Sequence, residues 1–217
     1  MIEGVEVTVS PEAVLVTARR ALTVVSTAIA GGGLTAARAV VNLHVPKNYP
    51  WRDGDTALRD FARARGVPAP WVGLLTSAWT EKAEVAPARG GGLTALAVAT
   101  VGLGNPVAAG ISPAAAPSAS TINVIVVVDA DAEPAALVNA ALTVTEVKTM
   151  ALMAAGVRCA DGALATGTST DAVVVAATGR GPRRRFGGPI SDLGWPVARA
   201  THTALTAGIR RWLEEHA

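Results

Sequence analysis

The stretch from Thr121 to Asp129 constrains the fold more than any other part of the chain. Nearly all of its residues are apolar and β-branched, namely Ile122, Val124, Ile125, Val126, Val127 and Val128. Such residues favour strands, and a strand that is apolar on both sides must be covered on both faces. The run therefore predicts a strand at the centre of a sheet.

The composition indicates a single domain spanning residues 1–217, half of whose residues are hydrophobic and only 4% aromatic. The formal net charge of +2 on a weakly charged chain is not the basic surface typical of nucleic-acid binding, so no nucleic-acid partner is expected. The single cysteine, Cys159, leaves no internal disulfide and is compatible with a reducing cytosol. We therefore expect a cytoplasmic protein.

A long uncharged segment between Arg89 and Asp129 raises the question of a membrane span. A continuous spanning helix is incompatible with its many interruptions, which are Gly102, Gly104, Asn105, Pro106, Gly110, Pro113 and Pro117. We predict a buried sheet region followed by a polar loop over Gly102–Ser120, with no membrane span.

The remaining patterns predict glycine-rich hairpins and about three helices. Strand-like runs at Leu22–Ala30 and Ala37–Val45 flank three glycines, which supply the positive φ angles of a tight turn. Further strands are expected at Glu6–Ser10, Ala13–Thr17, Val72–Trp79 and Leu93–Val101, and helices at Asp53–Gly66, Glu133–Gly156 and Pro196–Glu215. The expected fold is α/β (α+β), with a mixed, largely antiparallel sheet layered with these helices.

Polar side chains gather first at Asn42–Tyr49, where Pro46 ends a strand. Asn42 and His44 are two residues apart in an extended strand, so they point to the same face. His44 is the best-placed histidine, because the other two lie near the C-terminus. A catalytic histidine and a structural histidine at a strand end are equally compatible with this pattern.

A second group of polar residues lies on the otherwise apolar helix expected at Glu133–Gly156. Asn139, Thr143, Glu146 and then Thr149 or Met150 recur at steps of three and four residues, which predicts one polar stripe along one face. Lys148 points in a different direction. Because the rest of the helix is apolar, we expect the stripe, and Glu146 with it, to face a pocket or a partner.

The third group is the hydroxyl-rich turn Thr166–Asp171, which leads into a buried strand. Two interpretations stay open: a site, or a capped turn in which Asp171 accepts hydrogen bonds from backbone amides. Metal-ligand spacing and the common phosphate-binding and nucleophile motifs are missing from the chain. No metal site is expected.

These groups, in this order, resemble the adenosylcobinamide amidohydrolase family of corrinoid salvage. The resemblance is carried by Asn42–Tyr49, Gly102–Pro106, Thr121–Ile125, Thr145–Thr149, Gly167–Ala176 and Phe186–Gly194. It implies hydrolysis of the amide between the corrin ring and the aminopropanol arm of adenosylcobinamide, giving adenosylcobyric acid and 1-aminopropan-2-ol for cobamide salvage and remodelling. No cofactor is implied, since the cobalt belongs to the corrinoid substrate.

Amide hydrolysis needs a nucleophile, an oxyanion stabiliser and a proton for the departing amine. His44 or Glu146 is the candidate base for a water, and Lys47 or Lys148 the candidate oxyanion stabiliser or acid. A covalent route through Ser169 or Thr168, activated by a lysine, stays open. The candidate substrate-binding residues are Asn42, Asn48, Tyr49, Asn105, Asn139, Thr168, Ser169, Thr170 and Asp171.

A non-catalytic corrinoid-binding or carrier protein is the competing function. Tryptophans could cover the flat macrocycle in such a protein, and the candidates are Trp51, Trp71, Trp79 and Trp195. A carrier would bind the corrinoid without turnover. A homodimer is left open beside a monomer.

Overall fold

The computed structural model describes residues 1–115 and 120–217, apart from the side chain of Trp51. Its largest element is an eight-stranded mixed sheet with the order β4-β3-β2-β11-β8-β6-β5, in which β1 pairs with β2. These strands are β1 (Val5–Val9), β2 (Ala13–Ser26), β3 (Gly33–His44), β4 (Trp71–Thr76), β5 (Glu84–Gly90), β6 (Leu93–Val101), β8 (Ile122–Val128) and β11 (Ala172–Ala177). Two short pairs complete the set, β7 (Pro106–Val107) with β10 (Gly167–Thr168), and β9 (Asp131–Ala132) with β12 (Arg183–Arg184).

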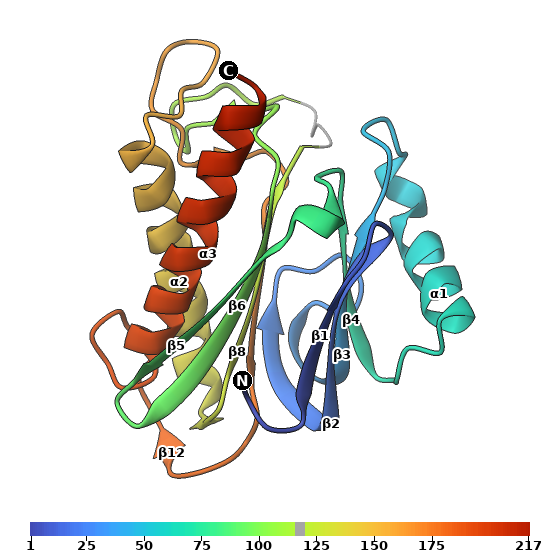
Figure 1. Cartoon of the computed structure of the whole chain (residues 1–217), viewed down its shortest axis with the longest axis vertical. Helices are drawn as coiled ribbons and strands as arrows, with labels where there is room; N and C mark the ends of the chain where they lie inside the picture. Colours follow the sequence, from blue (N-terminus) through green and yellow to red (C-terminus); the bar gives the residue numbers. More distant parts are fainter. Residues whose placement is uncertain (116–119) are drawn as a thin grey trace.

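Three α-helices cover the sheet, as the sequence predicted. They are α1 (Gly54–Ala64), α2 (Pro134–Ala154) and α3 (Gly194–Glu215), and two 3-10 turns lie at η1 (Trp51–Asp53) and η2 (Thr80–Lys82). Figure 1 shows α2 and α3 side by side on one flank of the molecule and α1 on the other. The α2–α3 pair packs on β5, β6, β8 and β11, and α1 packs on β3 and β4.

The sheet bends so that its two halves face each other. One half holds β2, β3 and β4, and the other holds β11, β8, β6 and β5, as Figure 1 shows. The inner faces share one apolar cluster, in which Val40 and Leu74 of the first half join Val98 and Ile125 of the second. The resulting layers are helix, half-sheet, half-sheet and helix pair, with a core between each two layers.

The strand predicted at the sheet centre is β8, and this prediction is confirmed. All seven of its residues are buried. It pairs in parallel with β11 and antiparallel with β6, and α2 and α3 cover its outer face. A strand whose side chains are apolar on both faces, with no alternation of apolar and polar residues, has to be buried on both faces.

Several predicted boundaries differ in the structure: β2 ends at Ser26 instead of Ala30, β3 begins at Gly33 instead of Ala37, and β4 ends at Thr76 instead of Trp79. The strands expected at Ala13–Thr17 and from Leu22 are one strand, β2, with a register shift between Thr17 and Leu22. Arg19 and Arg20 interrupt the apolar pattern but sit exposed at this irregularity, so the strand continues past them. The loop expected at Gly102–Ser120 contains β7, and its residues 116–119 lie outside the described part of the chain.

Among the described helices, α2 alone is long and apolar enough to cross a membrane by length and composition, with a mean hydropathy of 1.2. Half of that stretch is buried inside the protein. Its apolar character is accounted for by packing against the sheet and α3, as in other core helices.

Candidate active site

A buried ion pair joins α2 to the sheet. It is formed by Lys148 of α2 and Asp171, the residue before β11, whose side chains are only 8% and 9% exposed. Gly167 permits this approach, because a Cβ there would lie 3.0 Å from the Lys148 Nζ and closer still to the Asp171 carboxylate. Buried charges are costly unless they are paired and hydrogen-bonded, so this pair is a built feature of the fold.

The carboxylate of Asp171 accepts four hydrogen bonds. Oδ2 accepts from the Lys148 Nζ and from the backbone N–H of Thr168, at 3.0 Å for the latter. Oδ1 accepts from the Thr168 hydroxyl and from the backbone N–H of Ile122, which is 3.0 Å away. A single carboxylate therefore fixes the positions of α2, the 167–170 turn and the start of β8.

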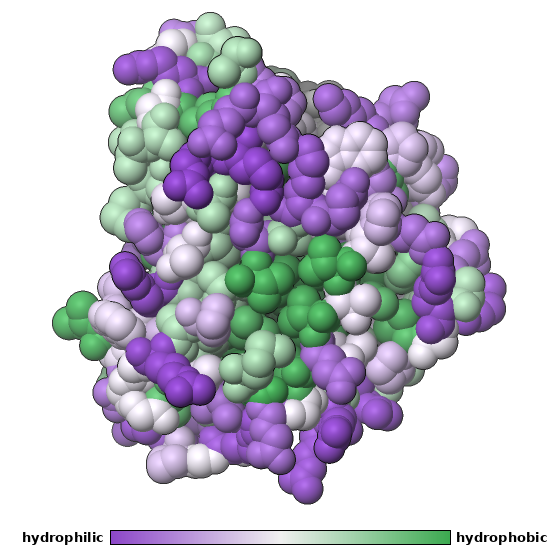
Figure 2. Space-filling view, viewed as in Figure 1, coloured by the Kyte–Doolittle hydropathy of each residue, from purple (hydrophilic) through white to green (hydrophobic). Residues whose placement is uncertain are grey.

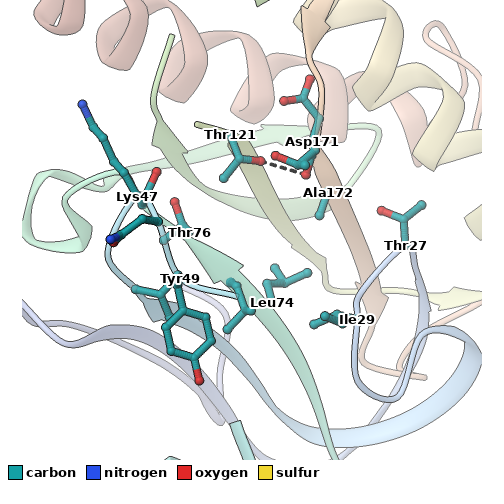
Figure 3. A pocket seen from close by; sticks show the side chains of 14 residues that line it. Thr27, Ile29, Lys47, Tyr49, Leu74, Thr76, Thr121, Asp171 and Ala172 are labelled. Carbon is teal, nitrogen blue, oxygen red and sulfur yellow. Dashed lines mark hydrogen bonds between the residues drawn. The ribbon is translucent and has the colours of Figure 1, made fainter. Parts of the chain in front are cut away.

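A pocket of about 630 Å³ opens beside Asp171, between the two halves of the sheet. Thr121 and Asp171 line one wall, and Lys47, Tyr49 and Thr76 line the other, as Figure 3 shows. Apolar side chains make up much of the remaining lining. A few polar groups that converge in a largely apolar pocket are typical of small-molecule sites.

A chain of buried polar side chains lies next to this pocket. The Asn123 amide donates to the Asn42 Oδ1 and to the Leu75 carbonyl oxygen, both at 2.8 Å, and the Asn42 amide donates to the Thr100 Oγ1 at 3.0 Å. These bonds connect β8 and β6 with β3 and β4 across the gap between the two halves of the sheet. Because each amide would be costly to bury unpaired, the chain holds the two pocket walls in register.

A second pocket of about 280 Å³ adjoins the first, and the two share Lys47 and Ser77 as lining residues. At its edge, the His44 Nδ1 lies 3.0 Å from the Ala78 carbonyl oxygen, which can only accept, so Nδ1 donates and in the neutral ring Nε2 is the acceptor. The His44 ring stacks on Trp79 with centroids 5.0 Å apart.

The family model for adenosylcobinamide amidohydrolase matches residues 1–217, the whole chain. The chain belongs to this family. A Methanosarcina mazei protein described as adenosylcobinamide amidohydrolase is 28% identical over 189 residues, which cover 82% of this chain and 86% of that protein. The family and the hydrolase class predicted from the sequence motifs are thereby confirmed.

The overall architecture has a counterpart among solved structures. A Burkholderia sp. beta-aminopeptidase aligns with a TM-score of 0.52 over 96% of this chain and 84% of its own, at 14% identity. Identity at that level shows a common fold alone. The reaction follows instead from the amidohydrolase family, whose members cleave the aminopropanol arm of a corrinoid in cobamide salvage.

The structure brings several predicted site residues together. Lys148, Thr168 and Asp171 form the ion-pair cluster. The wall opposite Asp171 and its neighbour Thr170 contains Lys47, Asn48 and Tyr49. Asn105 lies farther out, where its amide donates to the Ser169 Oγ at 2.6 Å.

The stripe expected on α2 does not face one common pocket. Asn139 and Glu146 are exposed on the outer side of the helix, whereas Thr143 is buried and donates to the Gly187 carbonyl oxygen at 3.1 Å. Glu146 lines a shallow hollow on the outer surface with Met150 and neighbouring residues. Glu146 was a candidate base because its side of the helix was expected to face a pocket in the core, and the structure does not show this. The charged residue of α2 that faces the sheet is Lys148.

Sequence reasoning did not assign roles to Thr100, Thr121 and Asn123. Thr121 lines the pocket and donates to the Thr170 carbonyl oxygen at 2.8 Å, and Asn123 anchors the buried polar chain. A signal was present for one of them. An amide inside the most apolar strand of a chain must find a hydrogen-bonding partner, and Asn123 finds it in Asn42.

Proposed function

We propose that the pocket beside Asp171 is where this chain hydrolyses the aminopropanol amide of adenosylcobinamide. The observation that carries this proposal is the buried Lys148–Asp171 pair, whose carboxylate lines the pocket while binding the hydroxyl of Thr168. The Lys148 ammonium and the Thr168 hydroxyl both contact this carboxylate, and such a group can activate a nucleophile.

The nucleophile we assign is the hydroxyl of Thr168, a buried residue that contacts the pocket-lining Asp171. Its proton already points at the Asp171 Oδ1, so the carboxylate can take that proton as the Thr168 Oγ1 attacks the amide carbon. Asp171 then passes the proton to the departing nitrogen, and 1-aminopropan-2-ol leaves. Water cleaves the resulting ester, releases adenosylcobyric acid and restores the hydroxyl.

Lys148 and Thr121 have supporting roles in this scheme. Lys148 keeps a positive charge beside Asp171, which favours the developing negative charge on the Thr168 oxygen. Thr121 lines the pocket on the same wall, and its hydroxyl can donate to the oxyanion of the attacked amide once it exchanges its bond to the Thr170 carbonyl oxygen. Attack by a water is the alternative, and it requires Asp171 to exchange its bond to Thr168 for one to that water.

Chromatography of the corrinoid products tests the function. The wild-type protein is expected to convert adenosylcobinamide to adenosylcobyric acid; recovery of intact substrate between about pH 6 and 9 would show the proposal to be wrong. Thr168→Val keeps the side-chain shape and should lower turnover on the order of a hundredfold or more. Thr145→Val, at an exposed threonine of α2, is the matched control and should leave turnover unchanged.

Hydroxylamine separates the two chemical routes. An ester on Thr168 would be intercepted as the corrinoid hydroxamate, whereas direct attack by water gives only the acid. A hydroxamate that persists in Thr168→Val would assign the nucleophile to another residue. Binding without any turnover by the wild type would instead support the carrier function.

We also propose that the reaction needs no metal held by the protein. Within the described residues, no group of three His, Cys, Asp or Glu side chains is arranged to hold an ion. Activity is expected to survive exhaustive treatment with EDTA, while the corrin retains the substrate cobalt. Loss of activity that added divalent ions restore would contradict this.

Self-association and a cytoplasmic location belong to the same proposal. The outer side of α2 exposes Val138, Leu142, Met150 and Met153 at 45–57% of their surface, a row that a second copy of the helix could cover in a two-fold contact. Light scattering should then give a dimer that Leu142→Lys converts to a monomer. The single buried cysteine supports a reducing compartment, which fractionation of the source cells would test.

A further inference from the structure

The second pocket contains an aromatic surface that the reaction does not use. Trp79 is 57% exposed, although tryptophan is usually well covered. Its ring is supported from one side by His44, at an interplanar angle of 18°. The indole is therefore held in place with a face available to a ligand, as in sites that bind flat rings by stacking.

A second aromatic pair lines the same pocket. Trp212 and His216 of the α3 end stack with centroids 4.0 Å apart and an interplanar angle of 8°. The cavity is thus lined by Trp79, which stacks on His44 behind it, and by both rings of the Trp212–His216 pair.

Most charged groups in this pocket are neutralised within the protein. Lys82 donates to Glu215 at 2.8 Å, and this bond lowers the pKa of the Glu215 carboxyl below its ordinary value. Arg211 is paired with Glu84. Of the cations that line this pocket, only Lys47, at the boundary with the first pocket, has no ion pair among the described residues. Aromatic faces with a single unpaired cation suit an uncharged heteroaromatic ring better than a phosphate, which is bound by several converging cations.

We infer that this pocket binds the adenine ring of the substrate's adenosyl ligand, an inference that rests on the proposed function. Lys47 and Ser77 line both pockets, so one large ligand can occupy them together. The corrin amide would then lie beside Asp171 while the axial adenosyl group stacks on Trp79. Stacking on an aromatic side chain binds a nucleobase strongly enough to contribute to substrate choice.

The test compares two substrates that differ only in the axial ligand, adenosylcobinamide and cyanocobinamide. Trp79→Ala should raise the KM for adenosylcobinamide about tenfold and leave the KM for cyanocobinamide within twofold, with kcat little changed; Trp79→Phe should recover part of the loss. Trp195→Ala is the matched control, because Trp195 is also exposed, at 46%, but packs on Gly90 instead of either pocket. Equal losses for both substrates in Trp79→Ala would overturn the inference.

Binding of 5′-deoxyadenosine gives a readout that does not depend on turnover. Saturation-transfer NMR should detect this nucleoside on the wild type and on Trp195→Ala, with the signal lost in Trp79→Ala. If the wild type cleaves no corrinoid but shows this pattern, the proposed function fails and the adenine site stands. If it cleaves adenosylcobinamide and Trp79→Ala binds the nucleoside unchanged, the adenine site fails and the function stands. Circular dichroism checks that each variant folds, and Trp79→Leu replaces the alanine variant if that one does not.

Discussion

The two sides of α2 carry two charged residues with opposite fates. Lys148 lies on the inner side, buried and paired with Asp171, whereas Glu146 lies on the outer side among exposed apolar residues. Two residues along a helix correspond to a rotation of about 200°, so the two side chains cannot serve one site. Because α2 is apolar on nearly all sides, its apolar pattern alone does not identify the buried face. The ion pair with Asp171 identifies it as the face that carries Lys148.

The largest effect is expected from Lys148→Met on the inner side. It leaves the Asp171 carboxylate buried without its cation, which should lower the free energy of unfolding by about 3–5 kcal/mol and abolish turnover. Urea denaturation and the product assay measure the two effects. The comparison would break if stability and turnover both stayed at wild-type level.

A double variant sharpens this result. Lys148→Met combined with Asp171→Asn removes both charges, so most of the lost stability should return while turnover stays absent. If the double variant were less stable than Lys148→Met alone, the Asp171 carboxylate would be stabilising the fold through its other hydrogen bonds, even without Lys148.

A smaller effect is expected from paired threonine substitutions on the two sides. Thr143→Val leaves the buried Gly187 carbonyl oxygen without its donor and should cost about 1–3 kcal/mol. Thr145→Val removes only a hydroxyl that bonds within its own helix, to the Ala141 carbonyl oxygen, and should change stability by less than about 0.5 kcal/mol. Equal costs in thermal unfolding would contradict the assignment of inner and outer faces.

The smallest effect is expected from Glu146→Gln. An exposed charge on the outer side should contribute less than about 0.5 kcal/mol to stability, and turnover should stay within twofold. A hundredfold fall in kcat at unchanged stability would reverse the comparison, because it would make Glu146 the base and move the site to the outer side of α2.

Much of the fold was predictable because it rests on local patterns. The apolar run that became β8, the glycine triplets at hairpin turns and the three amphipathic or apolar segments all report structure within a few residues. The bend of the sheet was not predictable in this way. It depends on contacts such as that between Asn42 and Asn123, which are 81 residues apart, and on the continuation of β2 past Arg19 and Arg20.

The site was predictable as a set of segments but not as a geometry. Asp171, Thr168 and Lys148 all fall in polar groups that the sequence singled out, yet their contacts join a helix to a turn 23 residues away. Periodicity favoured Glu146 over Lys148, because it placed Glu146 on a polar stripe, but it could not show which side of α2 is buried. The pairing with Asp171 supplies the missing information.

The order of strands in the sheet also limits how the protein can fold. β11 is inserted between β2 and β8, so β2 must wait for a partner about 150 residues later in the chain, and such distant pairing slows folding. The β2–β3 hairpin can form early, but Asp171 is the residue directly before the strand that closes the sheet. We expect refolded chains to regain turnover only with the slowest refolding phase, and activity that returned earlier would show that β11 docks before the rest. A nascent chain that ends with α2 would therefore hold the pocket residues of β4 and of the 47–49 segment but lack Thr168 and Asp171, the proposed nucleophile and its base.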